Sequence, residues 1–135
     1  MSTMIFPNLP VKNVEASKAF FKALGYDHDP RFSDENAVSI VISDTIVVML
    51  LAEPYFQTFT KKAVADTSTT VEALIALSVE SRQQVDELVD AALAAGGTAA
   101  GEAKDMGFMY GRDFFDLDGH HWEIVHMDLS AMPEG

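Results

Sequence analysis

The sequence predicts an α+β fold made of two successive βαβββ modules within a single domain of 135 residues. Two observations lead to this prediction. Each half of the chain has an amphipathic helical pattern among short, β-branched, apolar segments that are typical of strands. The halves also align at a constant offset of 68 residues, which places Val11 on Val79 and Phe20 on Leu88. Because residue identity between the halves is negligible, the duplication rests on the pattern alone.

Module one is expected to span about residues 4–52. Its expected elements are a strand at 4–11, a helix at about 14–24, a strand at 26–32, and a hairpin over 37–52 that turns at Ser43 and Asp44. Asn13 is a typical N-cap residue for the helix, and Gly25 is a typical C-terminal stop. Pro30 has no backbone N–H and therefore weakens the prediction of the second strand.

Residues 53–70 are expected to form a linker, because this segment is aromatic at its start and then polar and rich in threonine. It has room for one short helical turn. Module two then spans about residues 71–128. Its expected elements are a strand at 71–79, a helix that starts with a Ser81–Gln84 capping box and ends at Gly96 and Gly97, a strand near 98–103, and a hairpin that joins 108–115 to 121–127.

Charge and composition exclude several classes of function. The net charge is −12, and the basic residues form no cluster beyond Lys61 and Lys62, so we expect no nucleic acid and no membrane surface as partner. The absence of cysteine excludes disulfides, thiolate nucleophiles and cysteine-ligated zinc. The N-terminal residues lack the pattern of a signal peptide, and the longest apolar run, 46–52, is too short to cross a membrane. We therefore expect a cytoplasmic protein.

The segment DLDGHHWEIVHMD, residues 116–128, holds three of the four histidines and one glutamate. Within a strand, His121 and Glu123 are two residues apart and point to the same face. His120 is placed at the hairpin turn, where we expect it to be solvated. Trp122 points to the opposite face, and we expect it in the core.

The expected turn at Asp118 and Gly119 also predicts a register for the last hairpin. It pairs Phe114 with Glu123 and Arg112 with Val125, so that Tyr110, Arg112 and Phe114 share the face of Glu123. An ionised carboxylate in apolar surroundings is costly unless it is paired. We therefore expect Arg112 to be the partner of Glu123, either as a structural ion pair or as a pair that holds a ligand.

Three stretches carry a family resemblance: LPVKNVEASKAFFKALGY at 9–26, LIALSVES at 74–81 and FFDLDGHHWEIV at 114–125. In this order and spacing, the chain resembles the vicinal oxygen chelate superfamily, which includes glyoxalase I, extradiol dioxygenases and bleomycin-resistance proteins. The resemblance implies paired βαβββ modules whose mixed sheet curls around an open cup, with the helices on the outer face. It also implies a homodimer.

In metal-using members of that superfamily, four positions converge in the cup. The resemblance places them on Phe6, on Leu74, in the apolar segment 46–51 and on Glu123, so Glu123 is the one matched position that can bind a metal ion. A single carboxylate binds a divalent ion weakly. We therefore expect no metal cofactor. If Ni, Mn, Fe or Zn does bind, Glu123 and His121 are the expected ligands.

The expected function is the binding of a small molecule in the cup, as in the bleomycin-resistance branch. The expected ligand-binding residues are Phe6, Asn8, Met49, Phe56, Leu74, Tyr110, Arg112, Phe114 and His121, with Tyr55, Phe56 and Phe59 from the linker as a lid. Two alternatives stay open. One is an enzyme of the lyase, isomerase or dioxygenase type that uses Glu123 as a catalytic base. The other is a structural or interaction subunit.

Overall fold

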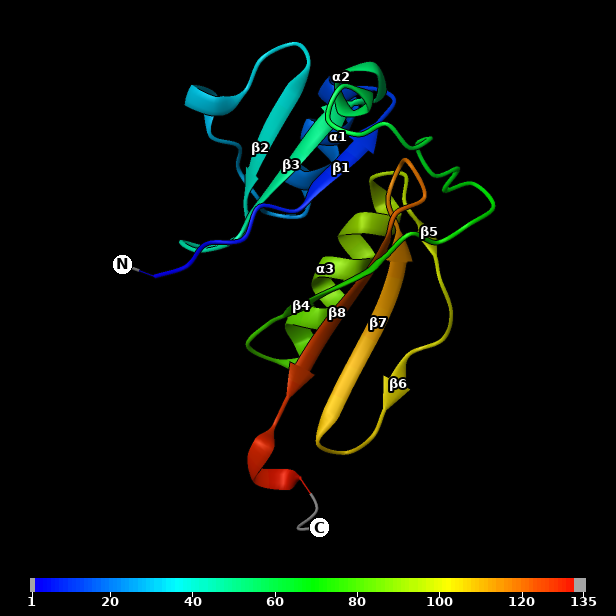
Figure 1. The fold of residues 1–135 in the computed structure, drawn as a ribbon. Helices are drawn as coiled ribbons and strands as arrows, with labels where there is room; N and C mark the ends of the chain where they lie inside the picture. Colours follow the sequence, from blue (N-terminus) through cyan, green and yellow to red (C-terminus); the bar gives the residue numbers. More distant parts are fainter. Residues whose placement is uncertain (1, 133–135) are drawn as a thin grey trace. The chain divides into compact units, whose positions relative to one another are not determined.

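The chain divides into two compact units, Met1–Ala65 and Asp66–Gly135, which we call module one and module two. The structure is a computed structural model that describes residues 2–132 (Figure 1). Each unit combines one longer helix with a mixed sheet, so the predicted α+β fold with two βαβββ-like modules is confirmed. The boundary between the units lies inside the segment 53–70 that was expected to be a linker.

Module one contains a three-stranded sheet of order β1-β3-β2, in which β1 is parallel to β3 and β2 is antiparallel to it. Its elements are β1 Asn8–Val11, α1 Val14–Ala23, the 3₁₀ helix η1 Pro30–Phe32, β2 Ala37–Val41, β3 Val47–Ala52 and α2 Glu53–Gln57. The predicted first helix is confirmed, with the Asn13 side chain accepting a hydrogen bond from the Ala16 N–H. Phe20 and Phe21 of α1 are buried, and the helix packs against β2 and β3.

The strand that was expected at 26–32 is reduced to an isolated bridge between His28 and Ile40. The chain then enters η1, because the Asp29 side chain accepts a hydrogen bond from the Arg31 N–H and Pro30 occupies the first turn. A proline at that place supplies a fixed φ that suits a helical turn and removes a strand donor. Asp29 and Pro30 therefore indicate the start of a helical turn, not a strand weakened by proline.

Module two contains a sheet of order β4-β8-β7-β5, with β6 also paired to β7. Its elements are β4 Leu74–Ser78, α3 Arg82–Ala94, β5 Thr98–Ala99, β6 Lys104–Asp105, β7 Met109–Phe115, β8 His121–Met127 and the 3₁₀ helix η2 Leu129–Ala131. The helix α3 packs against β7 and β8 through Val85, Leu88, Val89 and Ala92, which are buried. The strand expected near 98–103 is instead two short strands, β5 and β6, separated by the bend at Gly101.

The register of the last hairpin differs from the prediction by one residue. The Asp116 N–H donates to the His120 carbonyl at 3.0 Å, so three residues rather than two form the turn. Gly119, the last of them, has a φ of +85°, which favours glycine. As a result, Asp113 pairs with Glu123 and Phe114 with Trp122. A shift of one residue moves every side chain of a strand to the other face.

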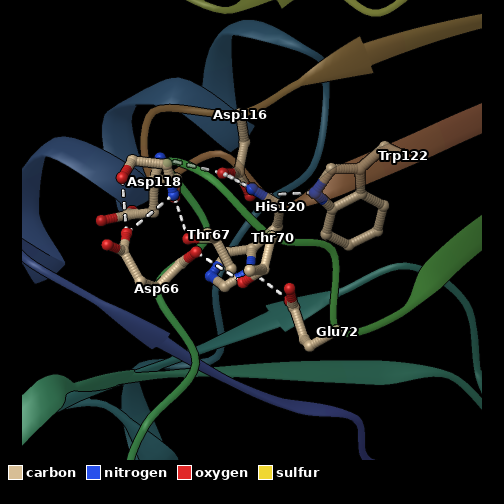
Figure 2. A network of polar contacts seen from close by, with 9 residues as sticks. Asp66, Thr67, Thr70, Glu72, Asp116, Asp118, His120 and Trp122 are labelled. Atoms are coloured by element: carbon tan, nitrogen blue, oxygen red, sulfur yellow. Dashed lines mark hydrogen bonds and ion pairs between the residues drawn. The ribbon is translucent and has the colours of Figure 1, made fainter.

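A network of polar side chains ties residues 66–72 to this turn (Figure 2). The Thr67 hydroxyl donates to the Asp118 carbonyl, and His120 Nδ1 lies 2.6 Å from a Glu72 carboxylate oxygen. His120 is only 1 % exposed, so the expectation that it is solvated was wrong. The polar segment that looked like part of a linker instead covers the turn and buries its histidine.

Asp116 directly precedes the turn, and its side chain holds the turn and the start of β8 in place. Its carboxylate accepts hydrogen bonds from the Trp122 indole N–H at 2.9 Å and from the backbone N–H groups of Asp118 and His120. Burial raises the pKa of Asp116, while His120 and these donors act in the opposite direction. Trp122 is fully buried, as predicted.

A surface ion pair holds β6 and the following turn to α3, and it leads to a first prediction. Arg82 binds both carboxylate oxygens of Asp105 at 2.8 Å and also donates to the Gly107 carbonyl. The Arg82 guanidinium, together with the Gly107 N–H, lowers the pKa of Asp105 to about 2. We expect Arg82→Met to raise this pKa towards the ordinary value of an aspartate, as measured by NMR titration of the carboxyl carbon.

The sign of the effect on stability follows from the lowered pKa of Asp105. A carboxyl whose pKa is lower in the folded state stabilises the fold above its unfolded-state pKa of about 4, and that contribution is lost as the pH falls towards 2. Lys22→Met, at an exposed lysine of module one, is the control and should leave the pKa of Asp105 unchanged. An unchanged pKa in Arg82→Met would contradict the ion pair.

Candidate functional site

Each module leaves one face of its sheet uncovered by its long helix, α1 or α3, and the sequence-predicted site residues fall on both faces of the sheets. In module one, Val48 and Leu50 of β3 are buried on the side of α1. Asn8 and Met49 are direct partners in the β1–β3 pairing, and they lie on the opposite, open face. The structure therefore brings these two predicted residues together.

A cavity of about 360 Å³ lies on this open face of module one. Its lining combines apolar and aromatic side chains with a few polar groups: Asn8, Arg31, Phe32, Ser33, Asp34, Ala37, Met49, Leu51, Tyr55 and Phe59. Tyr55 and Phe59 make an edge-to-face contact, with ring centroids 5.1 Å apart. Two of the three aromatic residues expected from the linker thus line the cavity. Phe56 and Phe6 are not among its lining residues.

The polar side of this cavity is fixed by short-range contacts within the segment 29–37. Arg31 donates from Nε and Nη2 to the two carboxylate oxygens of Asp29, at 3.1 Å and 2.8 Å. One oxygen of Asp34 accepts hydrogen bonds from the backbone N–H groups of Asn36 and Ala37. These bonds restrict the rotamers of two charged side chains beside the cavity before any ligand arrives.

On the open face of module two, three polar side chains come together on β7 and β8. Asp113 and Glu123 are direct partners in the antiparallel pairing, and His121 lies two residues from Glu123 on the same side. His121 Nε2 is 2.7 Å from Asp113 Oδ2. The strand β4 adds Leu74 beside His121 and Ala76 beside Glu123.

Three predicted site residues lie on the opposite, helix-covered face, because of the register change. Arg112 binds Asp86 and Asp90 of α3 at 3.1 Å and 2.9 Å, so the expected pair with Glu123 was wrong. The Tyr110 hydroxyl donates to Asp86 at 2.7 Å, and this bond, together with Arg112, lowers the pKa of Asp86. Phe114 is 1 % exposed and belongs to the core.

The residues present do not fit the divalent metal site of metal-using relatives. Asn8 lies on Ala76 at the offset of 68, and the sheet registers pair Asn8 with Met49 and Ala76 with Glu123, so Met49 occupies in module one the position of Glu123 in module two. Phe6, Leu74 and Met49 offer no oxygen or nitrogen ligand. Within residues 2–132, no three histidine or acidic side chains are placed to hold a metal ion.

Sequence reasoning missed two groups of residues on the open faces. Asp113 is one of them, and a three-residue turn ending in a left-handed glycine would have placed it beside Glu123. Arg31, Phe32 and Asp34 form the other group, in a segment that was expected to be a strand and its following loop. The Asp-Pro pair at 29–30, which starts η1, was the signal for their position.

Comparisons with known proteins agree with the fold described above. Residues 3–43 match the family of bleomycin resistance protein-like N-terminal regions. A hypothetical protein from S. aureus is 31% identical, with a TM-score of 0.79 over 93% of this chain and 94% of that one. A glyoxalase-related enzyme from Fulvimarina pelagi is 23% identical, with a TM-score of 0.76 over 100% and 94% of the two chains.

A bleomycin-binding protein in complex with bleomycin shows the same fold, at 16% identity and a TM-score of 0.61 over 93% of this chain and 98% of that one. Among curated proteins, none matches the sequence significantly. In residues 2–132, no helix is both long and apolar enough to pass through a bilayer. The family match, the 31% identical relative and the shared fold together show that the chain belongs to the glyoxalase/bleomycin resistance/dioxygenase superfamily.

Proposed function

We propose that the protein binds a small molecule of partly aromatic character in the cavity of module one. The cavity itself carries the proposal, because its volume of about 360 Å³ lies in the range of small-molecule sites. Aromatic and aliphatic side chains with a few oriented polar groups are the usual lining of such sites. Asn8, Arg31 and Asp34 provide those polar groups here.

Two further observations support binding rather than metal-dependent catalysis. A catalytic divalent ion needs several donors, and Glu123 is the one donor at the four matched ligand positions. The other three positions hold Phe6, Leu74 and Met49, which have no oxygen or nitrogen in their side chains. A solved structure of the same fold holds bleomycin, so the architecture can form a drug-sized site without further domains. The proposal takes from this comparison only that the ligand is a small organic molecule, not that it is bleomycin.

The test is an NMR screen of bleomycin and a set of aromatic heterocycles against protein labelled at its methionine methyl groups. Met49 lines the cavity and should report binding, whereas Met106 is 61% exposed on module two and serves as the internal control. Ligands that shift the Met49 signal support the proposal. If no compound shifts it, or if Met106 responds equally, the proposal is wrong.

Phe59→Ala gives the matching prediction for the aromatic wall. The side chain is 67% exposed, so its truncation should leave the fold intact and weaken the best ligand about five- to tenfold through lost stacking area. Leu129→Ala is the control, because Leu129 is 69% exposed but lies in η2 of module two. Calorimetric titration of both variants checks the expectation, and equal losses would contradict it.

A further inference from the structure

We propose that module one has a second binding site, on the helix side of its sheet, which takes a free α-amino acid with an aliphatic side chain. A cavity of about 200 Å³ forms this site, and we call it the helix-side cavity. It is lined by Val14, Glu15, Lys18, His28, Pro30, Ser33, Asp34 and Val38, all of module one. Binding there does not depend on the function proposed above for the cavity on the open face.

The strand β2 separates the two cavities of module one. Val38 lines the helix-side cavity, whereas its neighbour Ala37 lines the cavity on the open face. Consecutive residues of a strand point to opposite faces of the sheet. The helix α1 contributes Val14 to the helix-side cavity, and Ser33 and Asp34, which precede β2, line both cavities. The helix-side cavity is therefore a separate site that shares one wall with the other.

The helix-side cavity is apolar at its base and has a fixed wall. Val14 and Val38 at its base are only 6% and 1% exposed. The Ser33 hydroxyl donates to the Asp29 carbonyl at 2.7 Å and accepts from the Ser39 N–H at 3.1 Å, which ties the wall to β2. A wall that is ordered before binding lowers the entropic cost of binding. The volume is below the roughly 300 Å³ at which drug-sized sites begin, so the ligand must be small.

Opposite charges reach this cavity from two different elements. Lys18 of α1 lies 3.1 Å from Glu15, but these side chains are 33% and 74% exposed. Such a surface pair stabilises little, so a ligand carboxylate can take the place of Glu15. One oxygen of Asp34 accepts from the Asn36 and Ala37 N–H groups, and within residues 2–132 its other oxygen accepts no hydrogen bond. The cavity thus offers a cation for a carboxylate and a carboxylate for an ammonium group.

His28 adds a half-buried imidazole whose ring makes no hydrogen bond to any residue of the described chain. Polar groups that lose water on folding usually gain a partner, so this ring indicates a ligand or water in the cavity. A neutral imidazole can donate one hydrogen bond and accept one. It can therefore bind either end of a zwitterion beside Lys18 or Asp34. An α-amino acid carries both charges on one carbon, which suits the small volume, and its aliphatic side chain can lie on the two valines.

The test compares L-leucine with two molecules that each lack one of its charges. 3-Methylbutylamine lacks the carboxylate, and 4-methylpentanoate lacks the ammonium group. Binding is measured by calorimetry and by the NMR signals of the His28 ring. We expect leucine to bind at least tenfold more tightly than either, because each of the others loses one set of charge-assisted hydrogen bonds.

Two variants assign the charges to their partners. Lys18→Met keeps most of the chain length and should abolish the preference for leucine over 3-methylbutylamine. Asp34→Asn keeps the oxygen that accepts the two backbone N–H groups, and it should abolish the preference for leucine over 4-methylpentanoate. Lys22→Met is the matched control, because Lys22 is exposed on the same helix and does not line the cavity, and both preferences should remain.

Several results would overturn the amino-acid site. A lack of leucine binding would do so, as would equal affinities for the three compounds or an unchanged preference in Lys18→Met. An equal loss in Lys22→Met would show general attraction between charges. Leucine that shifts the Met49 signal but not that of His28 would lie in the cavity on the open face. Because Lys18 and His28 do not line that cavity, failure here leaves the function proposed for it untouched.

Discussion

Trp122→Ala is expected to lower the free energy of unfolding by about 3–5 kcal/mol, the usual range for truncating a fully buried large aromatic side chain. Trp122 has no exposed surface and lies on the helix-covered face of β8, where it pairs with Phe114. Its indole N–H also donates to the buried carboxylate of Asp116. The variant therefore leaves a cavity and removes a donor from a buried carboxylate.

Trp122→Phe leaves a smaller cavity, because it retains a buried ring, and it still loses the indole N–H. We expect it to cost about 1–3 kcal/mol, the range for leaving a buried acceptor without its donor. Urea unfolding followed by far-UV circular dichroism is the measurement, since both variants remove the single tryptophan of the chain. A loss below 1 kcal/mol in Trp122→Ala would argue against the core described for module two.

Gly119→Ala is expected to destabilise the protein by about 2–5 kcal/mol, for two additive reasons. The residue has a φ of +85°, which an L-amino acid adopts only at a cost. An added Cβ would also lie 2.5 Å from the Thr67 backbone carbonyl oxygen, which is closer than any real contact of this kind. Backbone on both sides of this contact would have to move.

Gly107→Ala is the control for the backbone strain. Gly107 has nearly the same φ, +81°, but a Cβ added there would meet no atom within 4 Å. This variant should cost only about 1–2 kcal/mol. The difference between the two variants, measured by urea unfolding, therefore reports the contact between Thr67 and the turn. Equal losses in both would show that residues 66–72 do not pack on the turn.

The elements with strong local signals were predictable from the sequence. Asn13 and Ser81 cap the two long helices as expected, because each precedes an amphipathic run and accepts a backbone hydrogen bond at its start. The hairpin of β2 and β3 was also predicted. The offset of 68 residues between the halves and the pattern of strands predicted the two-module architecture, which the structure confirms.

The site was predicted less well, because it depends on the register rather than on the identity of the elements. Asp118 and Gly119 suggested a two-residue turn, whereas the hydrogen bond between Asp116 and His120 closes a three-residue turn. Because the register shifts by one residue, Arg112 lies on the opposite face from Glu123 and binds acidic residues of α3. Asp113 takes its place as the residue opposite Glu123. The Asp116 carboxylate holds this turn from within, and the Thr67 hydroxyl adds a contact with the Asp118 carbonyl that is distant in sequence and that no local pattern reports.

The attachment of residues 66–72 to the turn before β8 decides where the two halves of this protein can be exchanged. The composition of residues 53–70 suggests a linker in which a junction would do no damage. A chimera that joins module one of this chain to module two of a relative at residue 71 would nevertheless separate Thr67 from Asp118. A junction before Asp66 keeps both partners of each contact in one parent, and it coincides with the boundary between the two compact units. For recombination within this superfamily, the crossover point therefore lies ahead of the threonine-rich segment rather than behind it.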